Sequence, residues 1–195
     1  NKAILLTNNQ TNNNASNQNI VVATQTNLPS ASASWRIGGG GQISNSNNYT
    51  SSGSSPVYPK VLISEVQIDG LNDSKEEFVE LYNPNNENVD LTGWYLQRKT
   101  KTGSSYSSFA TSVMFSGKSI AAGGYFLIAR AGFFANLADI STDNPLTEDN
   151  SLVLKNPAGN TSDKLGFGHA QEYETSPARN PVKGRSIGRN ASQQD

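Results

Sequence analysis

The amino-acid sequence predicts an all-β protein built as a β-sandwich. Two stretches between residues 60 and 98 alternate apolar and polar residues with the two-residue period of a strand, and no stretch between them has the period of a helix. Across residues 58–190, seven to nine short strand patterns follow one another at nearly regular spacing, with turn residues between them. Such a series of short strands is typical of a sandwich of two antiparallel sheets.

The composition of the chain changes near residues 56–59. Residues 1–58 consist mainly of Asn, Ser, Thr, Gln and Gly, and a segment of this kind buries too little apolar surface to offset the entropy lost on ordering. We therefore expect 1–58 to be a disordered low-complexity linker, or the remnant of a preceding domain. Charged, β-branched and aromatic residues become frequent from Lys60. The sandwich is expected over 59–190, with 191–195 as a tail.

Several classes of function are disfavoured by composition alone. The chain has no cysteine, which excludes disulfides, thiolate catalysis and cysteine-based zinc sites. Its net charge of −1 and pI of about 5.9 lack the basic excess of a dedicated nucleic-acid binder. No apolar run is long enough to be a transmembrane segment. Because the chain begins with Asn1, we expect a piece of a longer protein, with any secretion signal or anchor outside it.

The first two strands are the clearest. The first is expected within 60–69, where the alternation predicts that Leu62, Val66 and Ile68 face the core. The second is Phe78–Tyr82, whose two aromatic residues are expected on the face opposite its aliphatic ones. A run of Asn and Pro residues then ends this strand by turn chemistry.

Later strands are shorter and are separated by Gly-rich or Asn-rich turns. Val89–Arg98 is the third expected strand, and its Gly93 marks a bend or a close approach of another part of the chain. A loop is expected over 99–108, and Phe133–Ile140 is either a loop or a short helical turn. The remaining strands are expected at Phe109–Phe115, Ser119–Ile120, Tyr125–Ala129, Ser151–Lys155, Asp163–Gly168 and Ser186–Arg189.

Taken in order, these segments resemble the lamin tail domain family in its bacterial form. The resemblance covers about residues 59–190 and keeps the same order along the chain. Each segment alone is weakly specific, but the ordered set is distinctive. The matching segments are Val61–Val66, Glu77–Pro84, Val89–Leu96, Ile120–Ile128, Ser151–Gly159, Asp163–Gly168, Ser176–Ala178 and Gly184–Arg189.

The resemblance implies an immunoglobulin-like sandwich without enzymatic activity and without a cofactor. In animal nuclear lamins, domains of this family serve as interaction modules associated with DNA and protein partners. Bacterial members are typically parts of secreted or surface proteins. We therefore expect a non-catalytic interaction or structural module of an extracellular or surface-associated bacterial protein, which binds a protein or a surface polymer. The alternative is a module that binds nucleic acid, DNA in particular, through basic loops.

Two groups of basic residues are the candidates for binding a polyanion. One lies in and before a Gly/Ser-rich loop, and the other lies in a stretch without an acid between Glu174 and Asp195. Clustered cations bind phosphates and anionic polymers by releasing counterions. Solvated surface charge is the simpler interpretation of both groups. The candidate residues are Arg98, Lys99, Lys101, Arg179, Lys183, Arg185 and Arg189.

Acidic residues give weaker indications. Glu65, Glu77 and Glu80 fall on neighbouring expected strands, where paired carboxylates could act as acid and base or bind a cation. Alternate polar residues of a sandwich strand more simply face water. The loop Asp139–Asp149 has oxygen ligands at a calcium-like spacing, but it lacks the glycine and the bidentate acid of a calcium-binding loop. A solvated loop is therefore favoured over a calcium site.

The remaining conspicuous side chains do not indicate catalysis. His169 is the only histidine, and no serine lies in the strand–turn–helix context of a nucleophile elbow. Trp94 is expected in the core, because a tryptophan on a central sandwich strand buries a large apolar area. Tyr106 is close enough in sequence to the first basic group to offer a stacking surface. We assign no catalytic, cofactor-binding or metal-binding residue.

Overall fold

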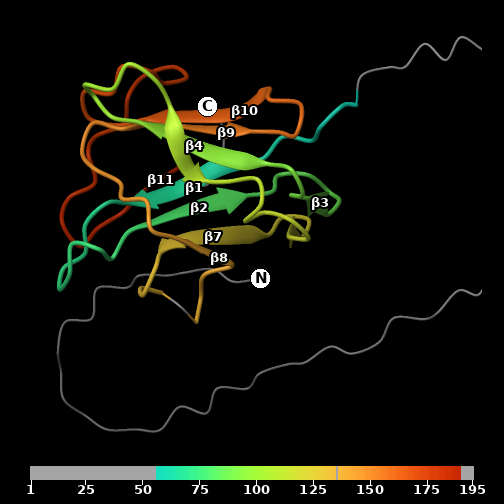
Figure 1. Cartoon of the computed structure of the whole chain (residues 1–195), viewed down its shortest axis with the longest axis horizontal. Coiled ribbons are helices and arrows are strands. Elements are labelled where there is room, and N and C mark those ends of the chain that lie inside the picture. Colours follow the sequence, from blue (N-terminus) through green and yellow to red (C-terminus); the bar gives the residue numbers. More distant parts are fainter. Residues whose placement is uncertain (1–55, 135, 190–195) are drawn as a thin grey trace, which may run out of the picture. The chain divides into compact units, whose positions relative to one another are not determined.

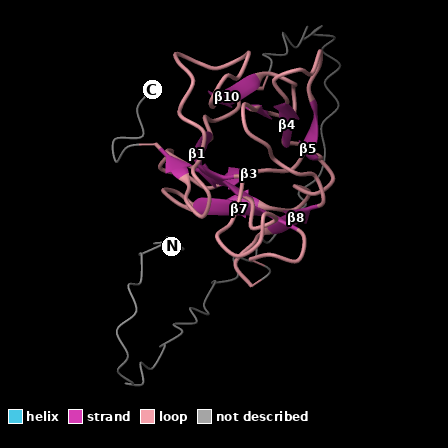
Figure 2. Cartoon of the chain, turned by 90° about the vertical axis from the view of Figure 1, so that its left-hand side faces the viewer, coloured by secondary structure: helices cyan, strands magenta, loops and turns pink. Residues whose placement is uncertain are grey.

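The computed structural model describes residues 56–134 and 136–189. Strands make up all the regular secondary structure of this part, and no helix occurs in it (Figures 1 and 2). The predicted all-β class is therefore confirmed. Nearly all of the predicted linker 1–58 and all of the predicted tail 191–195 lie outside the described residues. The proposed domain boundaries stay predictions.

The strands form two main sheets and one short ribbon, and Figure 2 shows the two sheets as separate layers. The first sheet has the order β11-β1-β2-β7-β8, in which β8 runs parallel to β7 and the other pairs are antiparallel. The second, fully antiparallel sheet has the order β10-β9-β4-β5, and β3 pairs with β6. The strands are β1 (Leu62–Gln67), β2 (Phe78–Tyr82), β3 (Val89–Asp90), β4 (Tyr95–Lys99), β5 (Ser107–Ala110), β6 (Ser119–Ile120), β7 (Tyr125–Arg130), β8 (Ile140–Thr142), β9 (Ser151–Lys155), β10 (Thr161–Gly166) and β11 (Ile187–Gly188).

Strand β1 does not alternate regularly: Leu62 is buried, as expected, but it does not share the main core cluster with Val66. The register with β2 shifts between Ile63 and Glu65 as a β-bulge. The extra residue reverses the alternation, so Val61 and Ile63 join Val66 in the core while Leu62 does not. A period-two pattern cannot reveal a bulge, because both phases of this strand are apolar.

The third expected strand is divided by a turn. In that turn the Trp94 backbone N–H donates to the Leu91 carbonyl at 2.9 Å. Gly93 has φ +85°, and a side chain there would begin 3.1 Å from Pro157. Both the bend and the close approach expected at this glycine are therefore confirmed. The strand expected over Phe109–Phe115 is also shorter, because β5 ends at Ala110 and turns follow.

The main core fills the space between the two sheets. Trp94 belongs to it with 1% of its surface exposed, which confirms its predicted role. Phe115 reaches the same core from a turn and stacks on Phe126 at a centroid distance of 5.7 Å. The segment between β7 and β8 forms turns and covers part of the outer face of the first sheet, where Phe134 packs edge-on against Phe78 at 5.6 Å.

One open side of the sandwich is closed by side chains instead of a backbone ladder. Asp163 of β10 is 1% exposed and accepts the Ile63 backbone N–H of β1 at 2.6 Å. The Arg189 Nη2 donates to both Asp163 carboxylate oxygens at 2.8 Å, and the Arg189 Nε donates to the Ile63 carbonyl at 3.0 Å. We call these three residues the Asp163 latch. It joins β1 and β10 where both strands are bulged.

The other open side of the sandwich is also closed by side-chain hydrogen bonds, here from uncharged groups. The Thr142 hydroxyl donates to the Phe109 carbonyl of β5 at 2.7 Å, and the Asn144 side-chain amide donates to the same carbonyl at 3.1 Å. Edge strands with free carbonyls and N–H groups are prone to pair with other chains. These polar side chains therefore satisfy the Phe109 carbonyl of β5 without adding a strand.

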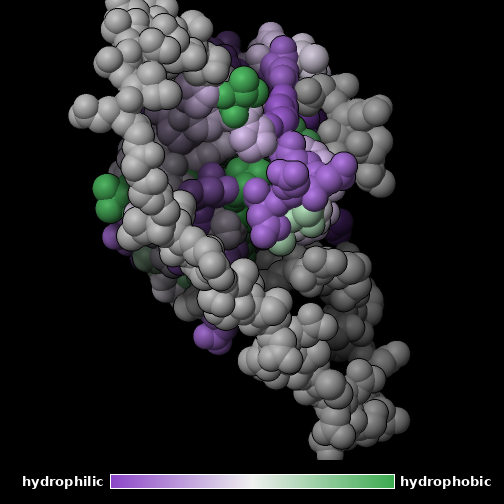
Figure 3. Space-filling model, turned by 90° about the vertical axis from the view of Figure 1, so that its right-hand side faces the viewer, coloured by the Kyte–Doolittle hydropathy of each residue, from purple (hydrophilic) through white to green (hydrophobic). Residues whose placement is uncertain are grey.

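Asparagine side chains organise the end of the sandwich at which β2 finishes. Asn83 is fully buried, and its amide donates to the backbone carbonyls of Glu87, Ile120 and Ala121 at 2.8–3.1 Å. Figure 3 views this end and shows hydrophilic residues gathered beside isolated apolar ones. The turn predicted from the Asn/Pro sequence is thus closed by hydrogen bonds from Asn83, which also join it to the segment at Ile120 and Ala121.

Replacement of Asp163 by alanine is expected to lower the free energy of unfolding by about 3–5 kcal/mol, because it leaves the Arg189 guanidinium without its buried carboxylate partner. Urea denaturation of the full chain at pH 7 measures this change. Asp143, which is exposed, provides a matched control: Asp143→Ala should change stability by less than about 0.5 kcal/mol. Equal losses in the two variants would contradict a structural role for the latch.

Candidate functional site

The longer connections gather at one end of the sandwich, on the left of Figure 1. We call this end the loop end. In immunoglobulin-like sandwiches, loops clustered at one end of the sheets are able to form a binding surface. The connections that meet there are Ile68–Glu77, Thr100–Tyr106, Asp143–Asn150 and Phe167–Ser186.

Glu172 binds three side chains from the second sheet and its loops. Its carboxylate accepts hydrogen bonds from Lys99, Lys164 and the Tyr106 hydroxyl, each at 3.0 Å. The hydrogen bond from Lys99, followed by the one from Lys164, lowers the pKa of Glu172 to about 2. Burial and the same carboxylate raise the pKa of Tyr106. Tyr106 is therefore committed to this network through its hydroxyl.

Asp149 joins three loops in the same manner. Its Oδ1 accepts the His169 backbone N–H at 2.7 Å and the Asn180 side-chain amide at 3.1 Å, and its Oδ2 lies 3.3 Å from the Lys101 ammonium. The hydrogen bond from the His169 backbone is the main reason that the pKa of Asp149 is lowered. A side chain at Gly168 would begin 2.1 Å from the Asp149 Oδ1, so only glycine fits beside this carboxylate.

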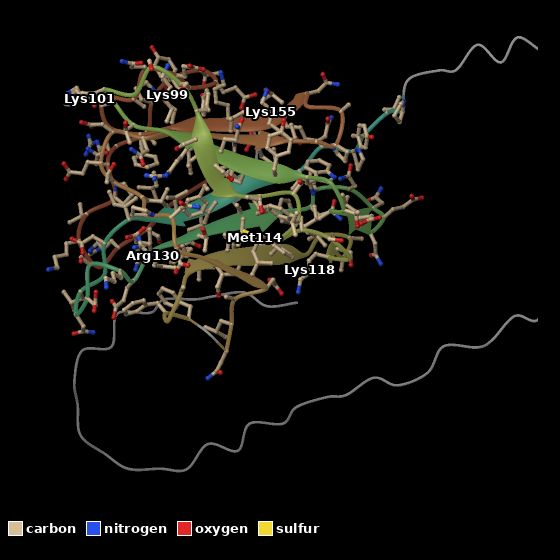
Figure 4. The ribbon with its side chains drawn as sticks, in the orientation of Figure 1. Lys99, Lys101, Met114, Lys118, Arg130 and Lys155 are labelled. Atoms are coloured by element: carbon tan, nitrogen blue, oxygen red, sulfur yellow. The ribbon has the colours of Figure 1, made fainter. Side chains whose placement is uncertain are left out.

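Glu77 is the most buried of the three carboxylates at the loop end. It pairs with Arg130 at 3.2 Å and accepts the Leu146 backbone N–H at 2.5 Å. Burial raises the pKa of Glu77 despite these partners. Burial also lowers the pKa of Arg98, whose guanidinium interacts with the Glu77 charge. Figure 4 shows Arg130 on the same side of the molecule as Lys99 and Lys101.

Four of the seven candidate basic residues therefore interact with acids of the same domain. Lys99 pairs with Glu172 and Lys101 with Asp149, while Arg98 interacts electrostatically with the buried Glu77. Arg189 belongs to the Asp163 latch and also lies 3.8 Å from Glu174. These acids are distant in sequence from the cations, which is why neither basic group looks neutralised in the sequence.

The three other candidates lie in one connection, the segment between β10 and β11. Arg179, Lys183 and Arg185 are all exposed, and none of them forms an ion pair within the part of the chain that the structure describes. The predicted second group is therefore divided: Arg189 points into the sandwich side, and the three others face solvent. Polyanion binding by these residues stays a prediction.

A cleft of about 820 Å³ opens at the loop end beside these cations. It lies between the β1–β2, β8–β9 and β10–β11 connections, and Lys183 is the one lysine or arginine on its wall. Sequence reasoning missed this cleft, because its walls come from three segments that are more than thirty residues apart in the sequence. The residues that line it are Ile68, Asp69, Ser74, Glu77, Leu146, Thr147, Glu148, Asn180, Pro181, Val182 and Lys183.

The acidic residues that suggested calcium binding have separate partners. Asp139 accepts the Leu127 backbone N–H at 2.8 Å, and Asp149 binds the loops described above. Within residues 56–134 and 136–189, no three acidic, histidine or cysteine side chains gather in a way that could hold a metal ion. The loop is organised by hydrogen bonds from backbone N–H groups to these carboxylates.

His169 lies beside Asp149, with its Nδ1 3.3 Å from the carboxylate, and its side chain is 80% exposed. The backbone N–H of the same residue makes the shorter bond to Asp149. The contact places an exposed imidazole at the rim of the loop end. In the described part of the chain, no helix is long and apolar enough to cross a membrane.

Comparison with protein-family models matched a large part of the chain. The model described as Lamin Tail Domain matches residues 54–169, which is more than half of the chain. The matched range ends before the β10–β11 connection reaches Arg179, and before β11. A search of curated proteins found no match.

Replacing Glu172 by glutamine is expected to destabilise the fold at pH 7 and to have progressively less effect below about pH 5. The folded carboxyl has a pKa of about 2, below its ordinary value of about 4.3, so its charge stabilises the fold above the ordinary value and this contribution is lost as the pH falls toward 2. Urea denaturation of both proteins between pH 7 and about pH 2.5 measures the difference.

The control for this experiment is Glu87→Gln, at an exposed residue of the opposite end. Its effect at pH 7 should be below about 0.5 kcal/mol. Equal destabilisation of the Glu172→Gln variant at pH 7 and at pH 2.5 would show that the charge of the Glu172 carboxylate does not stabilise the fold.

Proposed function

Because this chain belongs to the lamin tail domain family, we propose that it is a non-catalytic interaction module that binds an anionic protein segment or an anionic surface polymer through its loop end. The proposal includes the place of the module in an extracellular or surface-associated bacterial protein. That location is supported by the low charge and the high Asn, Ser and Thr content of the chain.

The observation that carries the proposal is a solvent-facing basic segment with no acid paired to it in the described residues. Arg179, Lys183 and Arg185 supply the charge. Two exposed apolar side chains flank them: Leu71 is 71% exposed and Val182 is 67% exposed. Cations beside exposed apolar surface favour a partner that has both anionic groups and some apolar surface.

The basic segment is held in place by the domain. The Gly184 backbone N–H donates to the Asp69 carbonyl at 2.9 Å, and a side chain at Gly184 would begin 2.9 Å from the Leu71 Cβ. The Arg185 backbone N–H closes a turn on Val182 at 2.8 Å. A segment that is already ordered loses less conformational entropy when it binds, so a small contact gives more affinity.

The number of cations bears on the class of partner. Proteins that bind duplex DNA strongly make about six to ten phosphate contacts, and each contact contributes to the salt dependence. Three cations and a nearly neutral chain fit a shorter anionic segment better than a duplex. Nucleic acid is nevertheless the appropriate comparison ligand, because its phosphates would engage the same side chains.

The double variant Lys183→Gln/Arg185→Gln is expected to weaken binding of the full chain to immobilised poly-L-glutamate by at least about fivefold. With two cations fewer on the protein, fewer counterions are released from the polymer on binding. Biolayer interferometry at 50 mM and 200 mM salt measures the affinity and its salt dependence. A duplex of about 20 base pairs is measured in parallel, and we expect it to bind less tightly than polyglutamate at the higher salt.

Lys118→Gln/Lys155→Gln is the matched control, because it removes the same charge near the opposite end (Figure 4). It should alter the affinity by less than about twofold. Equal losses in both double variants would show that attraction is non-specific. Tighter binding of the duplex than of polyglutamate would contradict the proposed partner and favour nucleic acid instead.

A further inference from the structure

Two carboxylates face each other on the outer face of the first sheet. Glu65 of β1 and Glu80 of β2 are register partners across the bulge. Like charges at directly opposite positions destabilise a sheet. Neither carboxylate has an ion pair with any cation of the described residues. The domain therefore bears an uncompensated repulsion at this place.

Serine hydroxyls hold the two carboxylates in fixed orientations. The Ser64 hydroxyl donates to the Glu80 Oε1 at 2.7 Å, and the Ser186 hydroxyl donates to the Glu65 Oε1. The second oxygen of each carboxylate makes no hydrogen bond within the described part of the chain. Glu80 is only 6% exposed as a residue, so its unused oxygen lies in a position that is largely shielded from water.

Two tyrosine rings continue the same face. Tyr82 follows Glu80 by two residues on β2 and is the register partner of Tyr125 on β7. Their ring centroids are 4.9 Å apart with an interplanar angle of 37°, and Tyr125 is 36% exposed. The faces of aromatic rings carry negative potential and attract cations. The Glu80 charge acts on Tyr125, since burial and then this charge raise the pKa of the phenol.

The charge of the site selects among possible ligands. A neutral sugar could stack on the tyrosines but would leave the Glu65–Glu80 repulsion in place. A metal ion needs more carboxylate or imidazole ligands than the described residues bring together here. A single ammonium or guanidinium group would compensate the carboxylates and contact the rings. Burial and the neighbouring Glu65 charge already raise the pKa of Glu80, as expected where a countercharge is missing.

We propose that Glu65, Glu80, Tyr82 and Tyr125 form a binding site for a lysine or arginine side chain presented by a peptide segment of a partner protein. The two carboxylates supply charge-assisted hydrogen bonds, and the two rings supply a cation–π surface. The site is formed by the strands of the outer face and shares no residue with the basic segment of the loop end. Its success or failure is therefore independent of the anionic partner proposed above.

Isothermal titration calorimetry of the full chain with acetyl-tetralysine amide tests the site, with acetyl-tetraglutamine amide as the neutral reference. We expect saturable binding of the lysine peptide alone. Glu80→Gln and Glu65→Gln should each weaken it by at least about fivefold, and Tyr125→Leu by about threefold. Glu87→Gln, which removes an exposed carboxylate at the end where β2 finishes, should leave the affinity within about twofold.

A titration of the Glu80 carboxyl by NMR provides a second readout. Bound cation favours the charged carboxylate, so the titration midpoint of Glu80 should move to lower pH when the lysine peptide is present. The glutamine peptide should not move it. If Glu80→Gln does not fold, Glu65→Gln and Tyr125→Leu carry the test, because both residues are at least partly exposed.

Three results would overturn the proposal. One is equal binding of the glutamine peptide. Another is a loss of affinity in Glu87→Gln as large as in Glu80→Gln, which would indicate general attraction to an acidic surface. The third is an unchanged titration midpoint for Glu80 at saturating lysine peptide.

Discussion

The fold depends on joining two sheets that share no strand, and the Asp163 latch makes that joint on one side. A buried carboxylate accepts a backbone N–H of β1 and a guanidinium from beyond β11, so one acidic group fixes two sheets and the end of the described chain. Burial of this carboxylate is tolerable only because each of its oxygens is hydrogen-bonded to a charged or backbone donor. The bulges of β1 and β10 supply the local geometry that such a contact requires.

The same principle organises the loop end. Three carboxylates from different connections each bind cations or backbone N–H groups of other strands or connections, and the loops are thereby tied to the rest of the domain. Of the seven candidate basic residues, the three that face solvent without an ion pair in the described residues all lie on the segment between β10 and β11. The charge pattern of the surface is therefore a result of tertiary pairing, and it leaves one basic segment facing solvent at the loop end.

Local patterns in the sequence predicted the strands and the core well. Trp94, Gly93 and the opposite faces of Phe78 and Val79 behave as expected, because burial and turn conformation depend on nearby residues. The bulge of β1 was not predictable, since both faces of that strand are apolar. The ion-pair partners of the basic residues could not be predicted from neighbouring residues either. Lys99 finds Glu172 and Arg189 finds Asp163 only after strands distant in sequence have packed together.

Native-state hydrogen exchange of the Ile63 amide tests most directly whether the Asp163 latch closes the sandwich. This N–H is bonded to the Asp163 carboxylate instead of a neighbouring strand backbone. If the latch closes the sandwich, the Ile63 amide exchanges only on global unfolding, with the same free energy as the amides of the β2–β7 ladder. Exchange as fast as that of amides in the exposed turns would contradict the latch, and with it the explanation of how the two sheets are held together.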